Sequence, residues 1–255
     1  MSDLSDRVQV TLAGGILTAT LNRADKRNAI DSAMIDALLA TFERADLDGE
    51  VRVVVLRGAG RDFCAGMDLN ELLASADHTP EQNRAAALHF GGIFPRMRRL
   101  PKPVVAVVQG RALAGGCGLA TGCDIVLAAE SAQFGYPEVQ RGFVPAIVMA
   151  LLRRAVGEKV AFDLAATGRL LDAAEAAAVG LVSRVYEDAD FEEQAGEVLR
   201  GLAASSPTAL AFTKQQFYHL DGLGFEDSIR LGADVNAVSR STPDFRAALT
   251  AFLKK

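Results

Sequence analysis

The sequence predicts an α/β fold that continues into a helical C-terminal region. Up to about Gly142, short apolar runs of strand type alternate with segments whose apolar residues recur at helical spacing. Several of these runs are apolar at nearly every position, which is typical of strands covered on both faces of a sheet. Half of the 255 residues are apolar and 23% are charged, so the chain can bury a large core.

The first predicted elements are a hairpin and a helix. Val8–Leu12 and Ile16–Leu21 are rich in strand-forming residues, and Gly14-Gly15 between them predicts a tight turn. Asp31 or Ser32 then caps a predicted helix. The apolar residues that fall on one face of this helix are Met34, Ile35, Leu38, Leu39 and Phe42.

A strand, a loop and a long helix are predicted next. Val51–Leu56 is a nearly continuous apolar run and predicts a buried strand, which the loop Gly58–Asp68 follows. One helix is predicted from about Pro80 to Arg99. The prolines within Leu100–Pro103 end this helix, because proline cannot continue one.

Further strands flank a glycine-rich turn. Val104–Val108 predicts a second buried strand, and a helix is expected from about Gly116. Strands are also predicted at Ile125–Ala129, near Ala132–Gly135 and at Leu181–Tyr186. The helices expected in the rest of the chain are Ala146–Ala155, Asp172–Ala178, Phe191–Ala203, Thr208–Leu220, Glu226–Ser239 and Pro243–Leu253.

No linker, repeat or low-complexity tract divides the chain. We therefore expect one structural unit, with an α/β core over residues 1–195 and a helical C-terminal region over residues 196–255. The net charge of −5 lacks the basic excess that is usual for nucleic-acid or anionic-membrane binding. The longest apolar run, Phe143–Leu152, contains Pro145 and has about half of the ~20 residues that a membrane span needs.

The start of the chain and the cysteines indicate a cytoplasmic protein. Met1–Arg7 has no basic region followed by an apolar stretch, so no secretory signal is expected. Cys64, Cys117 and Cys123 form an odd set without a CxxC pair, which favours reduced thiols. No cluster of His, Cys and carboxylate residues has the spacing of a metal site, so no metal is expected.

The glycine-rich segment Gly110–Gly122 follows a predicted strand and opens a helix, where backbone N–H groups are free to bind an anion. A Walker A loop would need a lysine where Gly116 stands, and a dinucleotide fingerprint would need a glycine where Thr121 stands. Two interpretations remain. The segment forms an oxyanion site with a second N–H from another loop, or it only packs a helix closely against a strand.

The loop Arg61–Leu69 also follows a buried strand. Its small residues Cys64, Ala65 and Gly66 would let a ligand approach the backbone. Asp68 is suited to cap the next helix. An ordinary turn with a helix cap would explain the same residues.

These two loops, in this order and spacing, resemble the crotonase superfamily, the enoyl-CoA hydratase/isomerase family. The resemblance covers nearly the whole chain. The segments that carry it are Asn22–Ile30, Phe63–Leu69, Gly110–Asp124, Phe134–Val139, Thr167–Val182 and Ala251–Lys255.

The resemblance implies a spiral of ββα units with a helical C-terminal trimerisation region, assembled as a homotrimer or a dimer of trimers. It implies an acyl-CoA substrate, with coenzyme A as part of the substrate and no separate cofactor. By position, the backbone N–H groups of Met67 and Gly115 would stabilise a thioester enolate. The residues expected to border the CoA are Lys26, Arg27, Ala29, Cys64, Ala65, Gly66, Asp68 and Leu69.

The acid–base group implied by the resemblance is Glu138. Hydratases of this family generally use a second glutamate, which would fall three residues after Gly115, where this chain has Gly118. After Pro145 the chain is apolar, where hydratases typically have a glycine-rich turn. A drier pocket of this kind should raise the pKa of a buried carboxyl group.

Several functions remain open at this point. The first is a hydratase that uses one glutamate. The alternatives are an isomerase that converts 3-enoyl-CoA to 2-enoyl-CoA, other CoA chemistry, and a CoA-thioester-binding protein without turnover. His78, His89 and His219 match no catalytic position of the family.

Overall fold

The computed structural model describes residues 6–254, and its main feature is a six-stranded sheet in the order β1-β2-β3-β4-β6-β9. The hairpin strands β1 and β2 are antiparallel, and every later neighbour in this sheet is parallel. The strands are β1 (Val8–Ala13), β2 (Ile16–Leu21), β3 (Val53–Gly58), β4 (Val104–Val108), β6 (Ile125–Ala129) and β9 (Arg184–Tyr186). The α/β class is therefore confirmed.

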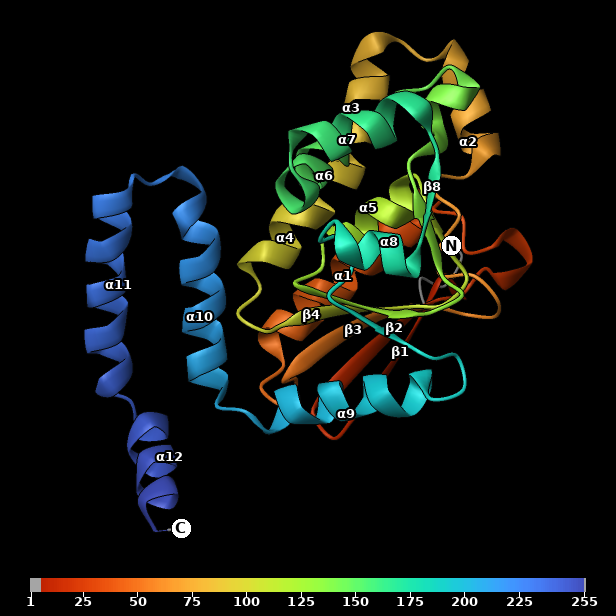
Figure 1. Cartoon of the computed structure of the whole chain (residues 1–255). Helices are drawn as coiled ribbons and strands as arrows, with labels where there is room; N and C mark the ends of the chain where they lie inside the picture. Colours follow the sequence, from red (N-terminus) through yellow and green to blue (C-terminus); the bar gives the residue numbers. More distant parts are fainter. Residues whose placement is uncertain (1–5, 255) are drawn as a thin grey trace.

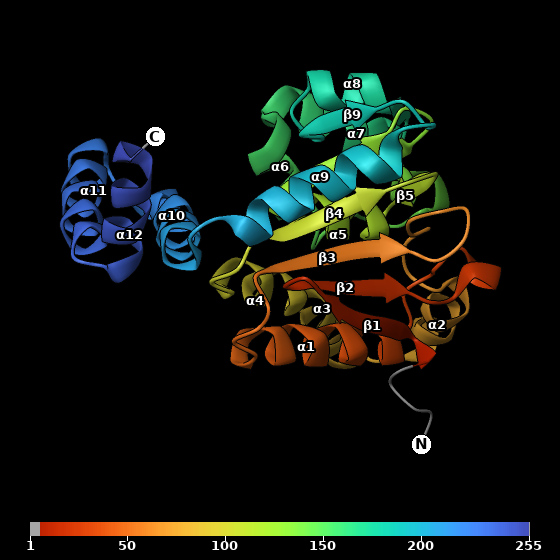
Figure 2. The same cartoon turned by 90° about the horizontal axis from the view of Figure 1, so that it is seen from below.

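The sheet is covered on both faces, as its continuous apolar strands predict. Val53, Val55 and Val105 point toward α9 (Phe191–Ala204) and form a small cluster with Phe191. The alternate strand residues join the larger core on the other face, because side chains of a strand alternate in direction. On that face lie α1 (Ser32–Leu47), α4 (Ile93–Arg99) and α5 (Gly115–Thr121), while α9 crosses the opposite face (Figures 1 and 2).

A second, three-stranded sheet in the order β5-β7-β8 brings the functional loops together. β5 (Arg111–Leu113) pairs in parallel with β7 (Gln133–Gly135), which pairs antiparallel with β8 (Leu170–Asp172). Sequence analysis found only β7 in this sheet. Strands of three residues are too short to show an alternating pattern, which explains why β5 and β8 were missed.

The prediction of a single helix from Pro80 to Arg99 was wrong. The structure has α3 (Pro80–Gly91) and α4, which begins at Ile93. Pro95 lies in the first turn of α4, where its missing N–H needs no partner, and the Gly91-Gly92 pair precedes it. The break therefore follows from glycine and proline residues inside the predicted segment.

Other boundaries also differ from the predictions. The helix expected from Ala146 begins at Met149 as α6 (Met149–Val156), and the strand expected from Leu181 begins at Arg184. One helix was missed, α7 (Glu158–Thr167), and α2 (Leu69–Ala74) was predicted only through its cap, Asp68. The helix expected from Asp172 begins one residue later as α8 (Ala173–Ala178), and Asp172 caps it by accepting a hydrogen bond from the Glu175 N–H.

The last three helices form an arm that stands away from the core (Figure 1). They are α10 (Pro207–His219), α11 (Phe225–Arg240) and α12 (Pro243–Leu253). Within the described part of these helices, α11 and α12 contain no buried residue. The predicted boundary at residue 195 falls inside α9, so the division at that residue stays a prediction.

The remaining expectations about location concern the membrane and the start of the chain. Over residues 6–254, no helix is both long and apolar enough to cross a membrane. The predicted absence of a secretory signal concerns Met1–Arg7, most of which lies outside the described residues.

Candidate active site

The loop after β3 lies along β5, and this pairing sets the position of the site. The Cys64 N–H donates to the Arg111 carbonyl over 3.0 Å, and the Leu113 N–H donates to the Cys64 carbonyl over 2.9 Å. These two bonds form a parallel bridge between Cys64 and Ala112. The two segments therefore run in the same direction, one toward Met67 and the other toward Gly115.

The Met67 N–H is free because of a second bridge. Ile30 donates to the Gly66 carbonyl over 2.8 Å and accepts from the Asp68 N–H over 2.8 Å. Met67 lies between Gly66 and Asp68. In a parallel bridge of this kind, its N–H points away from Ile30. Within residues 6–254, it donates no backbone or side-chain hydrogen bond.

The Gly115 N–H is free for a different reason, which is that Gly115 opens α5. The first N–H groups of a helix have no acceptor within it, and α5 has no side-chain cap. The preceding Ala114 has φ 51° and ψ −126°, a conformation that is costly for a residue with a Cβ. Its N–H donates to the Gly135 carbonyl over 2.8 Å, which ties the strained residue to β7.

The two free N–H groups lie close to each other. A Cβ placed on Gly66 would lie 3.5 Å from the Gly115 nitrogen and 2.8 Å from the Ala114 Cβ. Gly66 also has φ 102°, which favours glycine, so a side chain is excluded on two grounds. The structure thus brings together the two loops that carry the predicted donors, Met67 and Gly115.

Glu138 reaches the same region from β7. It lies in a short 3-10 helix, Pro137–Arg141, which begins two residues after Gly135. Its side chain is buried, and its Oε2 atom has no hydrogen-bond partner among the described residues. Burial raises the pKa of Glu138, while hydrogen bonding to its own N–H and the charge of Arg141 act in the opposite direction.

The other titratable groups beside Glu138 are poorly suited to proton transfer near neutral pH. Burial raises the pKa of the Cys117 thiol to about 11. It also raises the pKa of Tyr136, whose hydroxyl group lies 2.7 Å from the Thr121 hydroxyl. Because Thr121 belongs to α5, this contact packs the segment that begins at Tyr136, two residues before Glu138, against that helix. A buried carboxylate without a hydrogen-bond partner, on a segment packed against a helix that opens with a free N–H donor, is typical of a catalytic site.

The residues expected to border a ligand divide into two groups. Lys26, Arg27 and Leu69 are exposed, and Ala29 and Ala65 are half-buried. In contrast, the Cys64 thiol is buried and donates to the Asn28 carbonyl, and burial raises its pKa to about 12. Asp68 caps α2 and pairs with Arg23, so these two side chains hold the loop in place.

Arg23 and Asn28 were not predicted as site residues. Their side chains stabilise the loops around Met67 through hydrogen bonds. Arg23 donates to the Ala29 carbonyl over 2.6 Å and to Asp68 over 2.9 Å. Asn28 is fully buried and donates to the Ala59 and Asp62 carbonyls. Both residues lie in the Asn22–Ile30 motif, but that motif does not show which of its polar groups turn inward.

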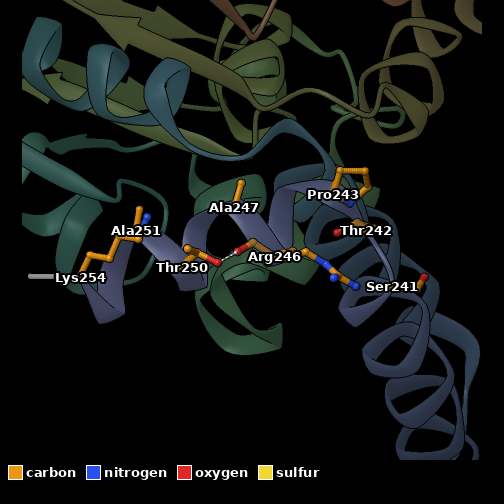
Figure 3. A pocket seen from close by; sticks show the side chains of 8 residues that line it. All are labelled: Ser241, Thr242, Pro243, Arg246, Ala247, Thr250, Ala251 and Lys254. Carbon is orange, nitrogen blue, oxygen red and sulfur yellow. Dashed lines mark hydrogen bonds between the residues drawn. The ribbon is translucent and has the colours of Figure 1, made fainter.

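A cavity lies elsewhere, along α12. It has a volume of about 690 Å³, and Figure 3 shows the residues around it. Its lining residues are Ser241, Thr242, Pro243, Arg246, Ala247, Thr250, Ala251 and Lys254. Because α12 belongs to the arm and α5 to the core, this cavity is separate from the site around Glu138 (Figure 1). We favour the site in the core, because the unpaired carboxylate and the free donors are there.

Comparison with known proteins identifies the family. The family profile described as "Enoyl-CoA hydratase/isomerase" matches residues 11–255. The chain belongs to the enoyl-CoA hydratase/isomerase family. Its crotonase-type fold is confirmed by the structure of an enoyl-CoA hydratase from Mycobacterium smegmatis, with a TM-score of 0.93. The two sequences are 30% identical, and the match covers 97% of this chain and 96% of the other.

Curated relatives of this enoyl-CoA hydratase/isomerase family member span two reaction types. A Thermus thermophilus protein named "Putative enoyl-CoA hydratase" is 42% identical over 95% of this chain and 96% of its own length. The 1,2-epoxyphenylacetyl-CoA isomerase of Escherichia coli is 32% identical over 94% of this chain and 93% of its own length. Membership of the family therefore leaves the choice between hydration and isomerisation to the residues of the site.

Proposed function

We propose that this chain acts on acyl-CoA thioesters, with an enoyl-CoA hydratase-type reaction that uses one glutamate. The observation that carries the proposal is the buried Oε2 atom of Glu138, which has no hydrogen-bond partner among residues 6–254 and lies on the segment that packs against α5. Family membership supplies the substrate class, and the names of the relatives favour hydration.

In this proposal, the Met67 and Gly115 N–H groups hold the thioester oxygen. As negative charge develops on that oxygen, the two fixed donors stabilise it, and loss of one such donor typically costs about 3–4 kcal/mol. Glu138 takes a proton from water while the water oxygen bonds to C3 of the enoyl group. The proton then passes from Glu138 to C2, so that one water molecule is added across the double bond.

Isomerisation is the second candidate, and Gly118 favours it. Glu138 would remove a proton from C2 of a 3-enoyl-CoA and return it to C4, which requires no second carboxylate. A glycine at position 118 supplies none. Other CoA chemistry and CoA-thioester binding without turnover are the remaining alternatives.

Two assays on the purified full chain distinguish these functions. Hydration of crotonyl-CoA and conversion of 3-enoyl-CoA to 2-enoyl-CoA are followed under the same conditions. We expect turnover of at least one substrate, with hydration the faster reaction. Absence of both activities, together with binding of a CoA ester in calorimetry, would support the binding-protein alternative.

CoA itself is proposed to lie along the exposed side of the two loops. Lys26 and Arg27 would attract its phosphates, while the backbone of Ala29 and of the Cys64–Leu69 segment would border its acyl-proximal end. We propose no cofactor other than the CoA of the substrate. Within the described residues, no group of three or more His, Cys, Asp or Glu residues could hold a metal ion.

Arg23 should position one of the proposed oxyanion donors. Lysine at position 23 cannot bond the Ala29 carbonyl and Asp68 together through a planar fork. We expect Arg23→Lys to lower kcat/KM about 10²-fold through displacement of Met67, because misplacement of about 1 Å has an effect of that size. Arg44→Lys, an exposed change on α1, is the matched control and should retain wild-type kcat/KM. Wild-type activity in Arg23→Lys would contradict the positioning role.

The arm is proposed to assemble the chain into a homotrimer or a dimer of trimers. On α11, Phe225 is 82% exposed and Ile229 is 61% exposed, and on α12 Phe252 is 74% exposed. Apolar surface on this scale usually marks an interface between proteins.

The free, buried thiols agree with the proposed cytoplasmic location.

Sedimentation tests the assembly. We expect wild type to sediment as a trimer or hexamer and Phe225→Ser/Ile229→Glu to dissociate, because a charge would enter an apolar interface. Glu193→Gln, an exposed change on α9, serves as the control. A monomeric wild type would refute the assembly.

A further inference from the structure

Gly118 lies in α5 with no room for a side chain. A Cβ at this position would lie 2.1 Å from Val148 Cγ1 and 2.8 Å from Val148 Cβ. Glycine is unfavourable inside a helix, so its place here needs a packing reason. Val148 supplies that reason, because its side chain occupies the space directly over the bare backbone of Gly118.

Val148 cannot readily move out of this position. It is buried, with an exposed fraction of 3%, and it precedes the first turn of α6. Its carbonyl accepts hydrogen bonds from the Leu151 and Leu152 N–H groups, over 3.0 and 2.9 Å. The side chain is β-branched and therefore has few alternative rotamers.

Val148 and Glu138 approach α5 from the same connecting segment. The Glu138 carbonyl accepts from the Phe143 N–H over 3.1 Å, and the chain then continues to Val148. On α5, the Thr121 hydroxyl lies 2.7 Å from the hydroxyl of Tyr136, two residues before Glu138, and the backbone of Gly118 lies against Val148. The Val148 side chain therefore packs on the same helix as the segment that carries Glu138.

We propose that Val148 is a specificity-determining residue, which excludes a second acid–base side chain, and the water it would hold, from the space over Gly118. Proton transfer then depends on Glu138 alone. This inference rests on the proposed function and adds to it the residue that sets the balance between water addition and proton return to carbon. A larger space at position 148 should favour water addition.

The first experiment measures this balance in the full chain. The ratio of crotonyl-CoA hydration to 3-enoyl-CoA isomerisation is compared in wild type, Val148→Ala and Leu151→Ala. Leu151 is another buried apolar residue of α6, so its truncation controls for general loosening. We expect the ratio to rise roughly tenfold in Val148→Ala, the effect of one small apolar change in a pocket, and to stay near wild type in Leu151→Ala.

A second set of variants restores a carboxylate. Gly118→Glu alone should show no gain in hydration, because Val148 occupies the required space. Gly118→Glu/Val148→Gly should hydrate crotonyl-CoA faster than Val148→Gly alone. Val148→Gly is used here because alanine would keep the Cβ atom that lies 2.8 Å from the new side chain.

A double-mutant cycle read out by Tm tests the packing without a measurement of activity. We expect Gly118→Ala to lower Tm by roughly 5–10 °C in the wild-type background, and by much less in Val148→Gly. Additive Tm changes would overturn the claim that Val148 blocks position 118. An active enzyme with an unchanged ratio in Val148→Ala would overturn the inference and leave the proposed function intact. A wild type that converts neither substrate would overturn the proposed function itself.

Discussion

Replacement of Glu138 by glutamine is expected to lower kcat on the preferred enoyl-CoA about 10²–10⁴-fold, the usual contribution of a positioned acid–base group. Glutamine has nearly the same shape as glutamate, but it cannot accept and return a proton. Steady-state kinetics on both proposed substrates measure the effect. A 3-fold change or less would remove Glu138 from the mechanism.

The pH profile gives a second measurement on the same residue. Burial raises the pKa of Glu138, and the carboxylate must be ionised to act as a base. The wild-type rate should therefore rise with pH through a pKa above the usual range for glutamate. That limb should be absent from the residual activity of Glu138→Gln.

Stability should change in the opposite direction to activity. A raised pKa in the folded state means that folding favours the protonated form, so this stabilisation is present below the unfolded pKa and is lost as pH rises through the folded pKa. Glutamine stays neutral at every pH. We expect Glu138→Gln to be more stable than wild type at neutral pH and close to it in acid, as measured by urea unfolding.

Replacement of Lys214 by methionine should produce the largest loss of stability, about 3–5 kcal/mol in the free energy of unfolding. The buried ammonium group lies 2.7 Å from Asp124 Oδ2 and donates to the Met97 and Lys102 carbonyls over 2.8 and 2.9 Å. Burial lowers the pKa of Lys214, and the charge of Asp124 partly offsets this. Methionine would leave the carboxylate without its cation and the two carbonyls without their donor.

Urea unfolding of Lys214→Met and of Lys159→Met, an exposed control on α7, measures this loss. Lys214 is also the buried residue of α10, the first helix of the arm, so its loss should weaken attachment of the arm. The variant should therefore sediment as smaller species at a given concentration. Equal stability of the two variants would show that the buried pair contributes little.

Much of the site could be predicted from local sequence patterns. Gly66 and Gly116 mark the two loops because a close approach of backbones requires glycine, and Asp68 was predicted as the cap that it forms. The break between α3 and α4 depends on glycine and proline inside a helical pattern, and β5 and β8 are too short to have a pattern of their own. The strands β5 and β8 therefore form because they pair with β7, which lies between them.

The sequence by itself determined the class of the fold, the family and the absence of a carboxylate at position 118. Those properties depend on residue type and on spacing along the chain. Only the tertiary structure decided that the loops carrying the Met67 and Gly115 N–H groups lie against each other, and that Arg23 bonds the carbonyl of Ala29 and the side chain of Asp68. It also decided that Val148, thirty residues further along the chain, fills the space over Gly118. The physical reason is that packing distances join residues whose separation in sequence carries no periodic signal, so the shape of the site appears only in the folded chain.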